Sequence, residues 1–590
     1  MLDKPMAKPM DKSSEDTGQP LRIGLLVDGP QVSKYYYDFI KWAADRQNIE
    51  ITHLIIHSAH GAESKKTRLP KLLRRLVDFV GAARQRGIYS AASDTLSTLL
   101  LSLIVRIERR FVSPDSYRSF DASALVKDSI IINPKISKSG FVYRFDQTHV
   151  GKVRDLNFDL LIRLGTGILR GDILHASRLG VISFHHADNR VNRGGPAAFW
   201  EVYHHEDTTG FTLQRLTDEL DGGVVLLRGN FWTRGYYLLN REALLEKSSY
   251  HLKFLVDRIA GAGRLPDAAR DTPYSNKLFR RPRAHEALIY LADQFWRRAK
   301  RIYRNRNGIY PRWGVAYTRS DWREAVLWRG VKLETPPQHF LADPFVITRG
   351  GRDYCFVEDY DYTKRRGDIS VYDITNEGGV RLGTALEEGF HLSFPFLFEH
   401  DNRLFMCPET NQANEIRIYR CIEFPLKWTL EKVIMRELSA ADTMLFEKDG
   451  KWWMLTNIDP AKMGDHCSEL FIFSSDSPLS EDWKPHPLNP ILIDASRARN
   501  AGLLKDGDKY FRVSQGQGYD TYGKRALINE IVELTESNYV EACIGEITPK
   551  FANGLAGTHH MHSNGKVTAF DFVSPSKIKF GSPGGKLTNG

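Results

Sequence analysis

The chain has 590 residues, too many for one hydrophobic core, and its 42% hydrophobic and 26% charged residues are typical of a globular protein. Its five cysteines are scattered and form no Cys-x-x-Cys pair, which excludes a disulfide scaffold and argues against a structural zinc site. The net charge of +10 is not accompanied by a nucleic-acid-binding motif. We therefore expect no metal and no nucleic-acid partner.

The first residues give no sign of secretion. Residues 1–20 are polar and predict a disordered tail rather than a signal peptide. The longest apolar run, from Leu96 to Val105, is too short to span a bilayer. We therefore expect a cytoplasmic protein, with membrane association only at its surface.

Strand and helix patterns alternate over residues 21–264. The apolar run at 21–28 predicts a buried parallel strand, and a helical pattern and a second strand follow it. Residues 60–150 have the pattern of a helical insertion, after which the alternation resumes at 158–165. This order predicts an α/β doubly wound domain.

A polar loop follows the predicted strand that ends at His185 and His186. Ligands bind beyond the carboxyl ends of such strands, and a His with a carboxylate partner is a general acid/base unit. His185 and Asp221 are therefore candidate catalytic residues, although strand-end histidines are more often caps or core residues. Further candidates in and near this loop are Ser183, His186, Asn189, Arg193, Gly194, Gly195 and Thr212.

The ordered series around this loop resembles the folate-dependent formyltransferases over residues 150–230. The series is a strand-end His, an Arg-Gly turn with a Pro, Gly-x-Thr and Leu-Asp-x-Gly. The resemblance implies a cofactor, 10-formyltetrahydrofolate, whose formyl carbon an amine attacks. It also implies that His185 and Asp221 are catalytic and that Ser183 stands where the family has an oxyanion-stabilising Asn.

Two basic segments interleave Lys and Arg with apolar residues at helical spacing. They cover residues 65–80 and residues 276–306, and the second lies in a predicted basic helical connector at 265–335. One interpretation is a packed helix with a solvated basic face. The other is peripheral contact with an anionic membrane surface or a phosphorylated substrate.

A repeat of strand, polar turn and strand begins near residue 336. Its copies lie at 342–359, 393–410, 441–458, 500–517 and 557–572. Each copy is a β-hairpin, and the spacing between copies leaves room for four strands in each. Five such units predict an all-β, five-bladed β-propeller over residues 336–590.

Polar residues recur at fixed places in these copies. Asp343 and Asp442 precede the apolar part of two first strands, and Glu358 and Glu409 end two second strands. They are either turn and cap residues or the lining of a sugar-binding funnel. Later copies add Arg499, Asn500, Gln515 and His559.

The motifs HFLADPF, HLSFPFLF, MCPET and PLNPI resemble five-bladed propellers of glycoside hydrolase family 43. They resemble more closely the N-terminal region of plant glucosamine inositolphosphorylceramide transferases. The hydrolase scheme implies Asp343 as base and Asp442 as the carboxylate that tunes the acid, but Gln515 stands where the acid is expected.

These observations leave three functional hypotheses. The first is a formyltransferase-like enzyme that acts on an amino sugar or a nucleotide- or lipid-linked sugar in surface glycan synthesis, with a glycan-binding propeller. The second places a glycosidase or glycosyl-transferring activity in the propeller, beside a degenerate formyltransferase domain. The third is a non-catalytic glycan-binding protein. In each, the partner is a sugar or glycolipid.

Overall fold

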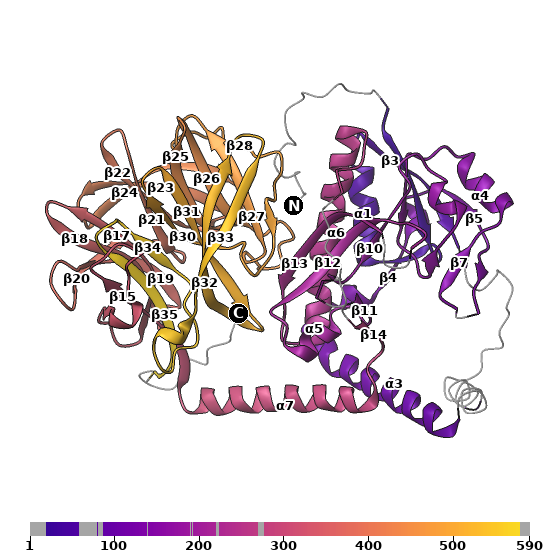
Figure 1. Cartoon of the computed structure of the whole chain (residues 1–590), viewed down its shortest axis with the longest axis horizontal. Coiled ribbons are helices and arrows are strands. Elements are labelled where there is room, and N and C mark those ends of the chain that lie inside the picture. Colours follow the sequence, from indigo (N-terminus) through magenta and orange to yellow (C-terminus); the bar gives the residue numbers. More distant parts are fainter. Residues whose placement is uncertain are drawn as a thin grey trace. The chain divides into compact units, whose positions relative to one another are not determined.

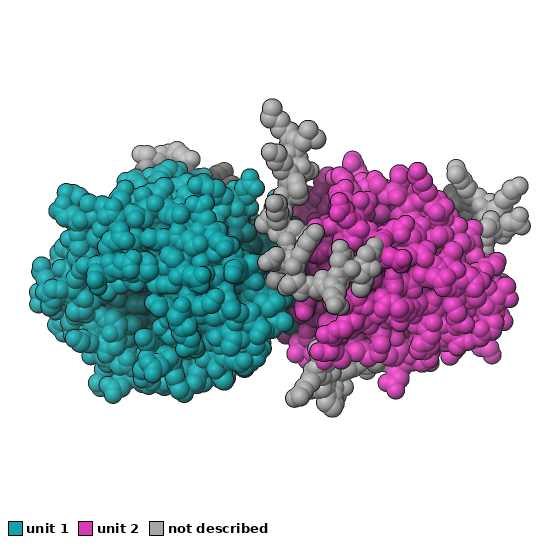
Figure 2. Space-filling view, turned by 90° about the horizontal axis from the view of Figure 1, so that it is seen from above, with its two compact units in different colours: residues 1–10, 230–232, 297–590 teal, residues 11–229, 233–296 magenta. Residues whose placement is uncertain are grey.

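The computed structural model describes residues 19–57, 80, 87–138, 140–188, 190–191, 193–219, 223–268 and 277–578. The chain divides into two compact units (Figure 2). One contains residues 11–229 and 233–296, and the other contains residues 1–10, 230–232 and 297–590. The expected N-terminal tail and the basic segment 65–79 lie outside the described residues.

A seven-stranded sheet forms the centre of the first unit (Figure 1). The neighbouring pairs β10–β8, β8–β1, β1–β3 and β3–β5 are parallel, whereas β12 runs antiparallel to β10. A mostly parallel central sheet of this kind agrees with the expected α/β domain. In sheet order the strands are β13 (Val224–Trp232), β12 (Thr208–Arg215), β10 (Val181–His185), β8 (Leu160–Arg163), β1 (Leu21–Val27), β3 (Ile49–Ile56) and β5 (Asp128–Ile131).

Helices α1 and α6 pack against this sheet, α1 on β3 and α6 on β12, because they present apolar residues at helical spacing. In α1 the buried side chains are Tyr35, Phe39, Ile40 and Ala43. Helix α1 contacts α6, which ends at Gly263 in the left-handed conformation that glycine tolerates best. The helices of this unit are α1 (Lys34–Ala44), α3 (Ile88–Glu108), α4 (Gln147–Arg154), α5 (Phe199–His204), α6 (Tyr237–Ala262) and the first part of α7 (Ala284–Arg306).

Helix α3 is longer than the apolar run suggested. Among the described residues, one helical segment, Ile88–Phe111, is long and apolar enough to cross a membrane by length and composition. Its mean hydropathy is 1.5 over the most apolar window, of which 17% is buried. Serine and threonine hydroxyls within this helix donate to carbonyls of the preceding turn, so these polar groups are satisfied inside the apolar segment. The expectation that this run is too short to span a bilayer is therefore wrong by these criteria.

Short strand pairs complete the first unit. They show that residues 60–150, where described, are not purely helical as expected, because β5 joins the central sheet. The pairs and triplets are β2 (Gln31–Ser33) with β4 (Ser119–Asp121), β6 (Lys135–Ile136) with β7 (Val142–Arg144) and β9 (Ile168–Leu169), and β11 (Arg193–Gly194) with β14 (Leu278–Phe279).

The second unit contains five sheets, each built on one hairpin of the repeat. The inner strands β17, β21, β25, β30 and β34 contact one another in this order, and β34 contacts β17. This ring of sheets is the arrangement of a five-bladed β-propeller. The first three sheets are β17–β20 (His339–Arg349, Arg352–Asp361, Arg366–Asp373, Val380–Leu386), β21–β24 (Ser393–His400, Arg403–Glu409, Glu415–Glu423, Lys427–Arg436) and β25–β28 (Ala440–Lys448, Lys451–Ile458, Glu469–Ser475, Lys484–Pro485), with β29 (Leu492–Ile493) on β27.

The last sheet joins the two ends of this unit. Strand β15 pairs with β35 over ten positions, so the propeller begins at Ile309 rather than at the expected residue 336. Closing the ring with an early strand leaves only short, protected edges. The remaining strands are β30 (Asn500–Asp506), β31 (Lys509–Gly518), β32 (Thr521–Leu534) and β33 (Tyr539–Ile547), followed by β34 (Met561–Ser563), β35 (Thr568–Lys577), β15 (Ile309–Thr318) and β16 (Val331–Lys332).

Candidate functional site

Bulges at the start of the inner strands position the repeated acids. The register of each hairpin shifts at this point in the first four blades, for example between Ala342 and Phe345. Asp343 and Asp442 have left-handed backbones there, with φ of 49° and 48°, and so does Phe394. A left-handed bulky residue is costly, and such bulges re-aim side chains beside functional sites.

Seven charged side chains from four blades and one connecting segment lie near one another at this end of the ring. Six of them are at most 6% exposed, and the side chain of Arg499 is 14% exposed. We call them the funnel cluster: Asp343, Glu358, Glu409, Asp442, Arg499, His559 and Asp571. The structure thus brings together the acids that the repeat predicted and adds Asp571 to them.

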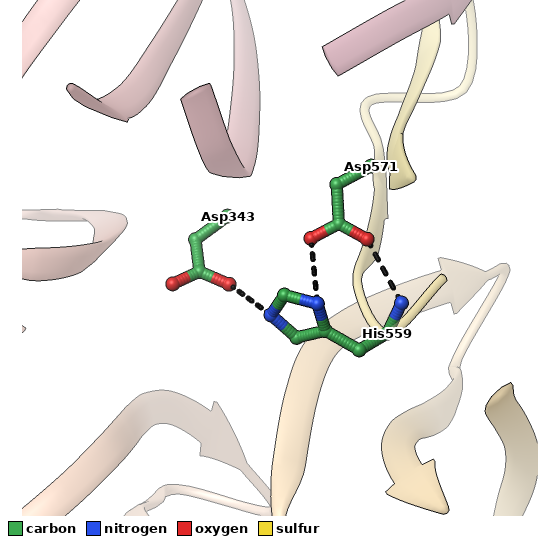
Figure 3. Close-up of side chains that lie close together, drawn as sticks. All are labelled: Asp343, His559 and Asp571. Carbon is green, nitrogen blue, oxygen red and sulfur yellow. Dashed lines mark hydrogen bonds and ion pairs between the residues drawn. The ribbon is translucent and has the colours of Figure 1, made fainter. Parts of the chain in front are cut away.

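A histidine between two carboxylates lies at one side of the cluster (Figure 3). His559 Nε2 lies 3.1 Å from Asp343 Oδ1, and His559 Nδ1 lies 3.0 Å from Asp571 Oδ2. The other Asp571 oxygen accepts the backbone N–H groups of His559 and His560. With a carboxylate at each ring nitrogen, His559 is held in a fixed orientation.

The two carboxylates favour the cationic form of His559. Burial alone would lower the pKa of His559, but the charges of Asp571 and Asp343 outweigh it and raise this pKa. Burial would likewise raise the pKa of Asp343, yet the hydrogen bond and charge of His559 lower it. Burial raises the pKa of Asp571 to about 6. Asp343 is therefore an ionised carboxylate at neutral pH.

An arginine pairs with the acids on the other side of the cluster. Arg499 donates from Nε to Asp442 at 2.6 Å and from Nη2 to Glu409 at 3.3 Å. Burial opposes this charge, but the carboxylates hold the pKa of Arg499 well above its ordinary value. Gln515 donates to Asp442, and Asn500 donates to the backbone carbonyl of Asp442. These two predicted residues thus position Asp442.

Glu358 lies among the acids without such a cation. The nearest ring nitrogen is His391 Nε2, 3.6 Å from Glu358 Oε1. The backbone N–H of Gly367 donates to His391 Nδ1, and burial lowers the pKa of His391 to about 4, so this ring is neutral at pH 7. Burial and the charges of the neighbouring acids raise the pKa of Glu358 well above its ordinary value. Glu358 therefore keeps its proton where Asp343 has lost its own.

This difference predicts a stability effect for Glu358→Gln. A carboxyl whose pKa is raised on folding binds its proton more tightly in the folded state. At a pH below the pKa that this carboxyl has in the unfolded chain, both states are protonated and the free energy of unfolding is unaffected. As the pH rises from there towards the pKa in the folded chain, the free energy of unfolding falls. Glutamine has no proton to release on unfolding, so we expect the variant to equal the parent at pH 4 and to exceed it by about 2 kcal/mol at pH 8.

Urea denaturation at the two pH values measures this effect. Glu447→Gln, in another blade of the propeller and with an exposed side chain, is the control and should change neither midpoint. An equal stability change at both pH values would show that folding does not raise the pKa of Glu358.

Asp343, His559 and Asp571 also satisfy the geometry of a metal site. Their ligand atoms lie within 4.8 Å of one another in the part of the chain that the structure describes. Both His559 ring nitrogens already face carboxylates, so a metal ion would have to displace one of these contacts. The absence of a metal thus stays a prediction.

A cavity of about 290 Å³ lies toward the other end of the inner strands. Phe396, Glu399, Glu447, Lys505 and His562 are among its lining residues. None of its lining residues belongs to the funnel cluster, so the cavity is separate from the acids.

In the first unit, the carboxyl ends of the central strands carry a smaller polar group. Ser183 is buried, and its hydroxyl accepts a hydrogen bond from Arg163 at 3.0 Å and donates to the carbonyl of Phe184 at 3.2 Å. His185 pairs in register with Thr212, whose hydroxyl donates to the carbonyl of Ala187. The single proton of Ser183 thus donates to a neighbouring carbonyl in this structure, and its role at an oxyanion stays a prediction.

Some residues predicted to act in the loop after β10 lie outside the described residues, and packing explains why others have the residue type that they have. Asn189 and Asp221 lie outside the described residues, as does the side chain of Arg193. Gly194 has φ of 103°, and a Cβ there would lie 1.9 Å from the carbonyl oxygen of Phe279, so packing alone requires this glycine. Neighbouring Gly195 precedes Pro196 in a cis peptide. Burial lowers the pKa of His186 to about 3.

Sequence reasoning missed three side chains at the same sheet edge. His57 follows β3, is fully buried and has no hydrogen bond at either ring nitrogen among the described residues. Asp28 follows β1, lies 3.9 Å from His57 and accepts the backbone N–H of Thr166. Arg163 ends β8, and burial lowers its pKa. The rule that strands of a parallel sheet end at one edge would have found all three.

Comparisons with known proteins match the propeller unit. Residues 328–565 match the family described as "Glucosamine inositolphosphorylceramide transferase 1, N-terminal". A protein of that name from Arabidopsis thaliana is 33% identical over 284 residues, which are 46% of this chain and 35% of the relative. The chain thus spans about a third of this relative. The expected resemblance to the N-terminal region of these plant proteins is confirmed.

Solved structures show weaker likenesses. The catalytic domain of a family 62 α-L-arabinofuranosidase from Coprinopsis cinerea is 9% identical, with a TM-score of 0.33, over 45% of this chain and 97% of its own. Glycinamide ribonucleotide transformylase 1 from Symbiobacterium toebii is 16% identical, with a TM-score of 0.27, over 43% of this chain and 99% of its own. Both likenesses are too weak to carry an argument about activity. The family match therefore covers residues 328–565, and the matched family is the N-terminal region of glucosamine inositolphosphorylceramide transferases.

Proposed function

We propose that the propeller unit is a carbohydrate-active module that holds the sugar of a glycolipid at the funnel cluster and catalyses glycosyl transfer. The observation that supports this is the division of one buried acid cluster into an ionised and a protonated carboxyl. His559 keeps Asp343 ionised, whereas Glu358 has no cationic partner. Two carboxyls whose environments separate their pKa values are suited to act as base and acid.

In the proposed reaction, Asp343 is the general base and Glu358 the general acid. The hydroxyl oxygen of the acceptor forms a bond to the anomeric carbon, and its proton passes to the Asp343 carboxylate. The bond between the anomeric carbon and the leaving oxygen breaks, and the Glu358 proton passes to that oxygen. His559 and Asp571 position Asp343 and keep it ionised, and Arg499 holds the two remaining acids.

The glycolipid as substrate follows from the matched relatives. Their name combines glucosamine, inositolphosphorylceramide and transferase, and this chain matches about a third of their length. We infer that the shared region recognises the sugar-bearing headgroup. Trp313 and Tyr522, whose rings lie 4.2 Å and 5.3 Å from that of His559, offer aromatic surface beside the acids.

The experiment is incubation of the full chain with a glycosylated inositolphosphoryl lipid and a sugar acceptor, followed by mass spectrometry of the products. A new glycosidic bond that disappears in Asp343→Asn supports the proposal. The proposal would be contradicted if the chain neither bound the headgroup at millimolar concentration nor formed any product. Binding without product would leave the third hypothesis, a glycan-binding protein.

Formyl transfer by the first unit is a second candidate. The position of His185 at the carboxyl end of β10, on the sheet edge that Asp28, His57 and Arg163 share, favours some chemistry there. The Ser183 hydroxyl, which donates to a neighbouring carbonyl in this structure, would have to leave that carbonyl to serve as the donor that a formyl group needs. Calorimetric titration with a 10-formyltetrahydrofolate analogue tests it. Heat of binding that His185→Ala removes would revive this candidate.

The two candidates make opposite predictions for one variant. We expect His185→Ala to leave glycosyl transfer unchanged within about twofold, because His185 belongs to the other compact unit and is not a member of the funnel cluster. The same product assay measures this, with Asp343→Asn as the inactive comparison. Loss of activity in His185→Ala together with an active Asp343→Asn would place the reaction in the first unit.

A further inference from the structure

Helix α7 carries a wide apolar face that the described chain leaves exposed. Two rows of large side chains run along it at intervals of seven residues, which places them on one face of a helix. A helix that packs on a soluble core buries this face, and exposed patches of this kind mark interaction sites. The rows are Leu288, Phe295 and Ile302, which are 52%, 65% and 46% exposed, and Ile289, Trp296 and Tyr303, which are 53%, 69% and 64% exposed.

Basic side chains occupy the flanks and the opposite side of the same helix. Arg298, Lys300, Arg301 and Arg304 are all exposed, and none forms an ion pair with a described residue. A helix with Trp, Phe and Leu on one face and Lys and Arg on the other is suited to lie in the plane of a membrane surface. The aromatic rings would then lie at the headgroup level, where their mixed character is favourable.

Helix α3 adds a second exposed apolar stripe, in the unit that contains the first part of α7. Its stripe consists of Leu96, Leu99, Leu103 and Ile107, each at least 39% exposed. The buried Glu108 at its end accepts a hydrogen bond of 2.5 Å from Tyr290 of α7 and another from the backbone of Leu238. This contact fixes the end of α3 against the first part of α7 (Figure 1). Arg109 and Arg110 continue the positive charge.

We propose that α7, with α3 beside it, binds the surface of a bilayer that contains anionic lipid, α7 lying in the membrane plane. A second copy of this chain is the other occupant that an exposed apolar face allows. Two copies of α7 face to face would bring their unpaired arginines and lysines together, which like-charge repulsion disfavours. Anionic headgroups instead complement those side chains, each of which contributes attraction near the surface.

Co-sedimentation of the full chain with vesicles tests this proposal. The probes are phosphatidylcholine vesicles with and without phosphatidylserine. We expect binding to the anionic vesicles, a loss of about tenfold or more in Phe295→Ser/Trp296→Ser, and weakening by salt. The matched control is Trp328→Ser in the other unit, where the tryptophan is 64% exposed, and it should bind like the parent.

A charge variant and a measurement without lipid complete the test. Arg298→Gln/Arg301→Gln should lose most of its binding to anionic vesicles, because each basic group contributes separately to the attraction. Failure of the parent chain to bind anionic vesicles would overturn the proposal. So would a dimer, detected by light scattering without lipid, that Phe295→Ser/Trp296→Ser converts to monomer.

Discussion

Asp343→Asn is expected to lower kcat/KM for glycosyl transfer by about 100- to 10,000-fold, the usual contribution of a general base. Asparagine accepts the left-handed backbone at this position almost as well as aspartate, so the bulge is retained. Its amide oxygen can still accept from His559 but cannot take a proton from an acceptor hydroxyl. The loss should therefore appear in kcat rather than in KM.

The control for this variant is Asp449→Asn. Asp449 has φ of 54°, close to that of Asp343, but lies in an exposed hairpin turn with a side chain that is 78% exposed. The same chemical change in the same backbone conformation should leave kcat/KM unaltered. If Asp343→Asn retains parental activity while still folding, Asp343 is not the base and the acid cluster has another role.

The repeat made the funnel acids predictable because equivalent positions of each blade meet at one axis. Asp343 and Asp442 share one position of the inner strand, and Glu358 and Glu409 share one position of its neighbour. Asp571 occupies that second position in the last blade, opposite His560. The last hairpin is shorter than the others. The fixed spacing that leads from the first acid to the second in the other copies therefore misses Asp571.

Two other features could not be read from the repeat. Strand β15, which completes the last blade, comes before the first copy, and its long partner β35 lies at the other end of the propeller sequence. Its neighbour in the sequence, β16, pairs with it over only two positions. The pairing of Arg499 with Asp442 and Glu409 depends on a segment between two blades, and sequence spacing does not fix where such a side chain points. In the first unit, the hydrogen bonds of the Ser183 hydroxyl could not be predicted for the same reason, because the sequence does not fix the direction of its side chain.

The geometry also changes the order of the functional hypotheses. The sequence alone favoured formyl transfer, because His185 and Asp221 belong to an ordered motif, and the comparisons do not support that activity. The propeller unit shows a buried cluster whose members have described partners and divided protonation states. A site of this kind is costly to bury, and such a cost is usual at functional sites.

Arg499→Met is expected to destabilise the propeller by about 3–5 kcal/mol. The methionine keeps much of the apolar volume but leaves Asp442 buried without the cation that contacts it at 2.6 Å, and an uncompensated buried charge is penalised by this amount. Burial and the charge of Asp442 raise the pKa of Glu409 well above its ordinary value, so Glu409 contributes less to this loss. Both carboxylates are at most 5% exposed, so water cannot replace the guanidinium. Urea denaturation followed by circular dichroism measures the loss.

Arg497→Met is the matched control, two residues away on the same segment. Its guanidinium pairs with Asp494 at 3.3 Å and is 40% exposed, and surface pairs of this kind contribute about 0–1 kcal/mol. Asp442→Asn/Glu409→Gln in the Arg499→Met background should recover most of the lost stability, because the charges that need the cation are then gone. Equal midpoints for Arg499→Met and the parent would show that Asp442 needs no cation in the folded chain, and the ion pair with Arg499 would then contribute nothing to stability.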